Sequence, residues 1–274
     1  LISIVIPNKD HVEDLRRCIT SIEKKSTWKN YEIVVVENNS VEQSIRDYYR
    51  ELESDPKVKI VTYEGGFNYS RINNVGVKET KGEYLLFLNN DTEVISPDWM
   101  EQLLMYAQRK DVGAVGAKLY YADNTIQHAG VVIGLGAHRS AGHTHYKMPR
   151  EHLGYMGRLC YAQDVTAVTG ACLMVKKSIY EEVDGLDESF TISLNDVDLC
   201  LKIREKGYLN IFTPFAELYH YESKTRGMEE GEKLRRYERE CAHFRDKWKE
   251  QLDAGDPYYN PNFSLDYSDF TLRF

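Results

Sequence analysis

The feature that most restricts the fold of this sequence lies in residues 1–116, where short apolar runs alternate with segments of helical period. The apolar runs are LISIVIP (1–7), the start of YEIVVVENNS (31–40), KVKIVTY (57–63) and YLLFL (84–88). Helical patterns occupy 11–25, the region up to about 53, 70–80, and 96–110 with Ser96 as its cap and Pro97 in its first turn. Because strand and helix alternate in this way in doubly wound folds, the sequence predicts an α/β fold with a Rossmann-like, mostly parallel central sheet flanked by helices.

The second half of the sequence is less regular. Strands are predicted in VGAVGAKLYY, TIQHAGVVIGLG, AVTGACLMVKK, YLNIFTP and AELYHYES, and helices in NDVDLCLKIREKG and at 229–252. The Gly- and His-rich segment 136–160 is predicted to be a long loop, and loops of that length are commonly functional. From residue 253 onward no periodic element is predicted.

Composition excludes several classes of protein. A formal net charge of -8 and a pI near 5.6, without a long basic run, argue against nucleic acid as a partner. The five cysteines are scattered, which argues against a disulfide framework or a zinc cluster, and Cys172 and Cys200 are interpreted as core residues. No apolar run is long enough for a transmembrane segment. These features fit the reducing cytoplasm. The sequence starts without an initiator methionine, inside an apolar run. The interpretation that the chain is a domain excised from a longer protein therefore stays open.

Polar residues follow two of the predicted strands, in VVVENNS and LLFLNNDTE. Such residues are common at strand-to-loop boundaries, but the carboxyl ends of parallel strands share one edge of a sheet, where α/β proteins bind ligands. No G-x-G-x-x-G follows the first strand and no P-loop motif is present. A nucleotide bound at this edge would need another counter-charge, which Asp91 with a divalent cation would supply.

At this point the chain resembles a known family. The motifs ISIVIPNKD, VVVENNS, GFNYSRINNVGVKETKGEYLLFLNNDTEV, VTGACLMVKK, NDVDLCLKIREKGY and ELYHYES, in this order over residues 1–226, are similar to those of family 2 glycosyltransferases of the GT-A fold, most closely the rhamnosyltransferase-like members of bacterial polysaccharide assembly. The resemblance implies transfer of a sugar, with inversion, from a UDP- or dTDP-linked donor to a saccharide or lipid-linked saccharide, with Mn²⁺ or Mg²⁺. It also implies a place in the cytoplasm or at the inner face of the membrane.

The resemblance carries roles onto individual residues. Asp91 and His220 match metal ligands, and Asp196 matches the general base. The residues that match donor-binding positions are Pro7, Asp10, Glu37, Asn38, Asn68, Arg71, Asn74, Asn90 and Arg226. Asn90 stands where many members have an acid, which leaves less negative charge at the cation. Gly170 and Asp198 are placed on the acceptor side. Residues 1–116 would bind the nucleotide sugar, 117–226 would bind the acceptor and catalyse transfer, and 227–274 would form a C-terminal helix and tail.

Other interpretations of these residues remain open. Glu37 is also a plausible helix-entry cap, Arg71 a surface helix residue in an i,i+4 pair, and Asp196 and Asp198 first-turn acids that favour the helix dipole. Histidines 128, 143 and 145 have metal-like spacing, but in a Gly-rich loop we favour solvated or hydrogen-bonded roles. A nucleotidyltransferase and a non-catalytic binding module are the alternative functions. The absence of a Gly-rich, basic loop after the first predicted strand argues against a nucleotidyltransferase.

Overall fold

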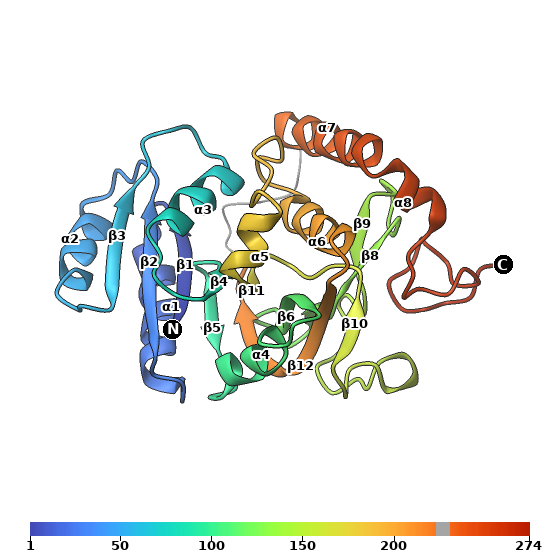
Figure 1. Cartoon of the computed structure of the whole chain (residues 1–274), viewed down its shortest axis with the longest axis horizontal. Helices are drawn as coiled ribbons and strands as arrows, with labels where there is room; N and C mark the ends of the chain where they lie inside the picture. The colour runs from blue at the N-terminus through green and yellow to red at the C-terminus, as the bar shows by residue number, and fades with distance from the viewer. Residues whose placement is uncertain (223–230) are drawn as a thin grey trace.

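A computed structural model describes residues 1–222 and 231–274 (Figure 1). The alternation of strands and helices predicted for the first part of the chain is confirmed. Its elements are β1 (Ile2–Asn8), α1 (Val12–Lys25), β2 (Tyr31–Glu37), α2 (Gln43–Leu52), β3 (Val58–Thr62), α3 (Tyr69–Lys78), β4 (Tyr84–Leu88), β5 (Thr92–Val94) and α4 (Trp99–Ala107).

The elements of the second part extend the same sheet. They are β6 (Val112–Tyr120), β7 (Ile126–His128), β8 (Val131–Ile133), β9 (Ala141–His143), η1 (Tyr155–Gly157), β10 (Gln163–Val165), β11 (Cys172–Lys176), α5 (Lys177–Glu182), α6 (Asn195–Glu205), β12 (Leu209–His220), α7 (Glu232–Lys247) and α8 (Lys249–Ala254). The main sheet has the order β10-β12-β6-β11-β4-β1-β2-β3. Strands β3, β2, β1 and β4 pair in parallel, whereas β11 is antiparallel to both of its neighbours. The prediction of an α/β fold with a mostly parallel central sheet is confirmed.

Helices cover both faces of the sheet because its strands are apolar on both sides. In β1, Ile4 and Ile6 join the core that α1, α2 and α4 cover, while Val5 faces the core covered by α3, α5, α6 and α7. Helix α1 buries Leu15 and Ile19, together with Cys18 and Ile22, along one stripe. This three-layer arrangement leaves the carboxyl ends of β1, β2 and β4 uncovered by the packed helices, so the polar residues that follow these strands can meet there.

Three local predictions are wrong. Ser96 does not cap α4, which begins at Trp99; its Oγ instead accepts a hydrogen bond from the Glu217 N–H at 2.8 Å. The two strands predicted around 208–223 form one strand, β12, which pairs with β6 on both sides of an irregularity between Phe212 and Glu217. The predicted loop 136–160 contains β9, which pairs with β8.

The C-terminal region packs against residues of the second half of the chain rather than extending into solvent. Phe244 of α7 is fully buried, and the tail packs Tyr259, Phe263 and Phe270 against Val132 and Leu135. The predicted absence of regular elements after α8 agrees with the structure, in which one isolated bridge joins Phe263 and Leu272. Among the described residues, no helix is both long and apolar enough to cross a membrane.

Candidate active site

A cleft of about 580 Å³ opens where β1 and β4 end, and this volume falls in the range of small-ligand sites. Its walls come from the loops after β1, β2 and β4, from β9, from the loop into α6, and from α7. Of the residues assigned from the sequence, those that line it are Pro7, Asn38, Asn90, Asp91, Gly170, Asp196 and His220. The cleft therefore collects the proposed metal ligands and the proposed base.

Asp91 and His220 lie side by side although they are far apart in the chain. Antiparallel pairing of β5 with β12 sets His220 opposite Thr92, next to Asp91. His220 Nε2 lies 3.1 Å from Asp91 Oδ1, and both side chains are nearly buried. Asn90, the residue before Asp91, donates from its amide to Asn8 Oδ1 at 2.6 Å and so connects the segment after β4 to the end of β1.

The hydrogen bonds of His220 show that this pair fits a cation. Its Nδ1 lies 2.6 Å from Gln127 Oε1, which can only accept, so Nδ1 carries a proton. In neutral His220 the Nε2 lone pair then faces the cleft, with Asp91 Oδ1 at 3.1 Å and the Asn89 side-chain nitrogen also at 3.1 Å, so an imidazole nitrogen and a carboxylate oxygen lie together where a cation could bind both. Carboxylate oxygen suits Mn²⁺ and Mg²⁺, and imidazole nitrogen is a common ligand of divalent transition metals, so the pair fits Mn²⁺ best.

Asp196 is held in the cleft by backbone donors. Its Oδ2 accepts from the Gly170 N–H and its Oδ1 from the Val197 N–H, each at 2.8 Å. The Gly170 carbonyl accepts in turn from the Tyr69 hydroxyl at 3.0 Å, and the same hydroxyl lies 3.3 Å from Asn89 Oδ1. These bonds connect the proposed base to the end of β4.

Asp10 and Glu37, two of the residues predicted to bind the donor, do not line the cleft. Asp10 Oδ1 accepts from the N–H groups of Val41 and Glu42, at 2.8 and 3.0 Å, and Glu37 accepts from the Ser40 N–H. Both carboxylates therefore hold the turn after β2. Glu37 acts as a turn acceptor rather than as the cap of α2, which begins at Gln43.

The three residues assigned to donor binding at the start of α3 and along it contact one loop, residues 186–188. Asn68 caps α3 by accepting from the Arg71 N–H at 2.9 Å and donates to the Glu188 carbonyl at 2.8 Å. Arg71 pairs with the Glu188 carboxylate at 2.7 Å, across the molecule rather than along its own helix, and Asn74 bonds to both Leu186 and Glu188. None of the three lines the cleft. The structure gives them a role in fixing the 186–188 loop.

Asp198 lies away from the cleft, and Arg226 lies outside the described residues. The Asp198 side chain is fully buried; its Oδ1 accepts from Trp248 Nε1 at 2.9 Å and pairs with Lys247 Nζ at 2.6 Å. Asp198 thus fastens α6 to the end of α7. Two residues away on the same helix, Asp196 faces the cleft.

Helix α7 has a role that the sequence did not predict. The sequence predicts a C-terminal helix without a part in the site, yet its Lys233, Arg236 and Tyr237 line the cleft. The Arg236 Nε is buried and has no hydrogen-bond partner in the described part of the chain. Glu240 accepts from the backbone N–H groups of Thr191, Ile192 and Ser193 and so fixes the loop that leads to the base.

His128, His145, Cys172 and Cys200, four residues considered in the sequence analysis, are buried. His128 is completely buried and hydrogen-bonds through Nδ1 to His143 Nδ1 at 2.8 Å, while His145 packs against Phe270. The expected hydrogen bonding is present, but the alternative of a solvated histidine is wrong for His128 and His145. Burial raises the thiol pKa of Cys172, which, like Cys200, is fully buried as predicted.

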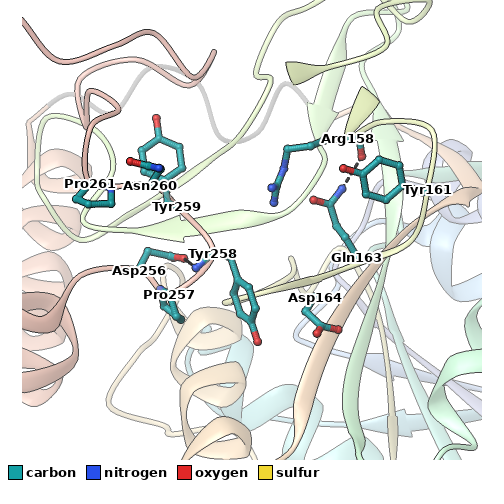
Figure 2. A pocket seen from close by; sticks show the side chains of 10 residues that line it. All are labelled: Arg158, Tyr161, Gln163, Asp164, Asp256, Pro257, Tyr258, Tyr259, Asn260 and Pro261. Carbon is teal, nitrogen blue, oxygen red and sulfur yellow. Dashed lines mark hydrogen bonds between the residues drawn. The ribbon is translucent and has the colours of Figure 1, made fainter. Parts of the chain in front are cut away.

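A second cavity, of about 530 Å³, lies between the segments 158–164 and 256–261 (Figure 2). Its walls carry aromatic and polar side chains, with Arg158 reaching between the two segments. It shares no lining residue with the cleft that holds Asp91 and Asp196. The chemistry is therefore assigned to the cleft.

Comparison with known proteins agrees with this geometry. Residues 3–184 match the sequence profile described as glycosyl transferase family 2. The chain belongs to glycosyltransferase family 2. The match covers β1 to α5, and so includes the ends of β1, β2 and β4 and the loop with Gly170.

Curated relatives in this family are considerably longer than the chain. It is 47% identical over 99% of its length to the protein named y4gI of Sinorhizobium fredii, of which it covers 30%. It is 35% identical, again over 99% of its length, to the O-antigen biosynthesis protein RfbC of Myxococcus xanthus, of which it covers 21%. The chain spans less than a third of either relative.

Solved structures confirm the GT-A fold that the resemblance implied. GalNAc-T7, solved with UDP, GalNAc and Mn²⁺, superposes with a TM-score of 0.71 at 16% identity, over 92% of this chain and 48% of that one. A mannosyltransferase from Pyrobaculum calidifontis, solved with GDP-Man and Mn²⁺, gives a TM-score of 0.61 at 14% identity, over 92% of this chain and 72% of that one.

Proposed function

We propose that this chain is an inverting hexosyltransferase that moves a sugar from a UDP- or dTDP-linked donor to a hydroxyl of a saccharide or lipid-linked saccharide. The observation that carries the proposal is the presence of the Asp91–His220 pair and of Asp196 in a single cleft at the carboxyl ends of the parallel strands. The proposed setting is cell-surface polysaccharide synthesis, which the relative RfbC, an O-antigen biosynthesis protein, supports; we place it in the cytoplasm or at the inner face of the membrane as part of the proposal.

In this proposal each side of the cleft has one task. Asp91 and His220 would hold Mn²⁺ or Mg²⁺, which neutralises charge on a leaving diphosphate. Pro7, Asn38 and Asn90 would contact the donor directly, while Asp10, Glu37, Asn68, Arg71 and Asn74 would fix the loops around it. Arg226, outside the described residues, would meet the diphosphate.

Asp196 would take the proton from the acceptor hydroxyl. An alcohol is a weak nucleophile, and a carboxylate within hydrogen-bond reach of it contributes roughly 10² to 10⁴ in rate. The two backbone N–H bonds to Asp196 fix the direction in which the carboxylate can accept that proton. Attack on the side opposite the leaving group inverts the anomeric centre.

Thermal denaturation with a panel of UDP and dTDP sugars, each with and without Mn²⁺, tests the donor and metal assignments. A donor at ~100 times its dissociation constant adds about 2.7 kcal/mol to the free energy of unfolding. We expect stabilisation that requires Mn²⁺ and is lost in Asp91→Asn but kept in the exposed control Asp123→Asn. Equal stabilisation of both variants, or none by any donor, would contradict the proposal.

A further inference from the structure

Gln127 is a buried amide on β7, within a segment whose neighbours Ile126 and His128 are also buried. It makes two hydrogen bonds in opposite directions. Its Oε1 lies 2.6 Å from His220 Nδ1, and its Nε2 donates to Glu222 Oε2 at 3.3 Å. A buried amide costs free energy unless both its ends are bonded, as they are here.

The orientation of this amide follows from its partners. A glutamine side chain can be turned over without changing its shape, so its hydrogen bonds must decide which end is oxygen. A Glu222 carboxylate can only accept, and it therefore selects the Gln127 NH₂ group. The oxygen is left facing His220, whose Nδ1 must then carry the proton.

The other ring nitrogen of His220 faces the cleft. His220 Nε2 lies 3.1 Å from Asp91 Oδ1 and 3.1 Å from the side-chain nitrogen of Asn89. Because Nδ1 carries the proton, Nε2 holds the lone pair of the neutral ring. The chain of hydrogen bonds from Glu222 through Gln127 to His220 therefore assigns the lone pair to the nitrogen that faces Asp91.

We propose that Gln127, oriented by Glu222, is a positioning residue that holds His220 in the tautomer able to ligate a divalent cation through Nε2. The inference rests on the proposed function, because it takes Asp91 and His220 as the metal ligands. Without the Gln127 oxygen, no acceptor favours the Nδ1–H tautomer, and the ring loses one of the hydrogen bonds that fix its orientation. Removing a hydrogen-bond partner of a metal-bound histidine typically weakens metal affinity about 10–100-fold.

The test is titration of the purified chain with Mn²⁺ in the presence of UDP, with a parallel series in dTDP, followed by the electron paramagnetic resonance signal of free Mn²⁺. Gln127→Leu keeps a side chain of similar size but has no acceptor, and we expect its Mn²⁺ affinity to fall 10–100-fold. The double variant Gln127→Glu/Glu222→Gln exchanges the amide and the carboxylate, retains an acceptor for Nδ1–H, and should bind within about threefold of wild type. Wild-type affinity in Gln127→Leu would overturn the inference.

A second readout does not depend on any variant folding. In ¹⁵N-histidine-labelled wild type without metal, the ring nitrogen shifts of His220 report which nitrogen is protonated, and His220→Ala assigns the resonance. We expect the Nδ1–H form; the Nε2–H form would overturn the inference. His220→Ala in the Mn²⁺ titration separates the two proposals. If that variant binds Mn²⁺ as wild type does, the proposed metal site itself is wrong, whereas if only Gln127→Leu is unaffected, Gln127 alone is misassigned.

Discussion

Asp196 and Asp198 occupy the same helix two residues apart, yet the structure gives them opposite roles. Asp196 faces the cleft with two backbone donors, and Asp198 is buried against Lys247 and Trp248. Asp196→Asn and Asp198→Asn are therefore a matched pair of nearly isosteric changes. We expect the first to reduce turnover and the second to reduce stability.

The size of the effect of Asp198→Asn follows from its contacts. Breaking a buried ion pair costs about 3–5 kcal/mol. Here Lys247 keeps its second partner Asp187 at 2.7 Å, and an amide at 198 can still accept from Trp248 Nε1. We therefore expect about 2–3 kcal/mol of destabilisation, which lowers Tm by roughly 5–10 °C in a domain of this size. Measured well below Tm, its kcat should stay within about threefold of wild type.

Asp196→Asn should behave in the opposite way. One of its two backbone donors loses an acceptor, at a cost of about 1 kcal/mol, while kcat falls by roughly 10² to 10⁴. Differential scanning fluorimetry and donor turnover, measured on both variants in one buffer, give the two quantities. If Asp198→Asn instead loses kcat with an unchanged Tm, while Asp196→Asn keeps its kcat, the base has been assigned to the wrong residue.

Three further predictions concern the surroundings of the site. A Cβ on Gly170 would lie 3.2 Å from the Tyr69 hydroxyl and 3.4 Å from Asp196 Cβ, so Gly170→Ala should lower kcat roughly tenfold, whereas Gly66→Ala, with open space around it, should not; equal kcat in both variants would refute this. Burial lowers the pKa of His145 to about 3, so the ring stays neutral in the folded state down to that pH. Between pH 7 and pH 5 the unfolded state therefore takes up a proton that the folded state does not, and the free energy of unfolding should fall by about 2 kcal/mol. Urea denaturation should show a smaller fall for His145→Gln, and an identical pH dependence would exclude this origin. Glu240→Gln should increase hydrogen exchange at 191–193, whose N–H groups its carboxylate accepts, and unchanged exchange would contradict the role given to α7.

The ends of the strands could be predicted from the sequence because they depend on short, contiguous patterns of apolar residues. Continuous apolar runs indicate buried parallel strands, and the carboxyl ends of such strands lie at one edge of the sheet. In the structure Asn38 and Asn90, which follow two of these strands, line the same cleft. Asp196 and His220 entered only through resemblance to a family, since nothing in their spacing indicates that they would share a cleft with Asp91.

The contacts that could not be predicted join segments distant in sequence without any periodic signal. The sequence of α3 allows Arg71 to be a donor ligand or a surface residue paired along its own helix, but the structure pairs it with Glu188, 117 positions away. Gln127 lies beside His128 in a motif that drew attention for its histidines, and only the pairing of β7 with β6 brings it to His220. The available signal was an amide, Gln127, within a segment that the sequence predicts to be a strand.

The measurement that tests the central claim most directly is ¹H NMR of the sugar that the wild-type chain first releases from its nucleotide donor in the presence of Mn²⁺. When water replaces the acceptor, an inverting enzyme releases the anomer opposite to that of the donor, before mutarotation equilibrates the two. The account predicts this opposite anomer, formed only with Mn²⁺ and strongly reduced in both Asp91→Asn and Asp196→Asn. Release of the same anomer as in the donor, or undiminished release by both variants, would contradict it.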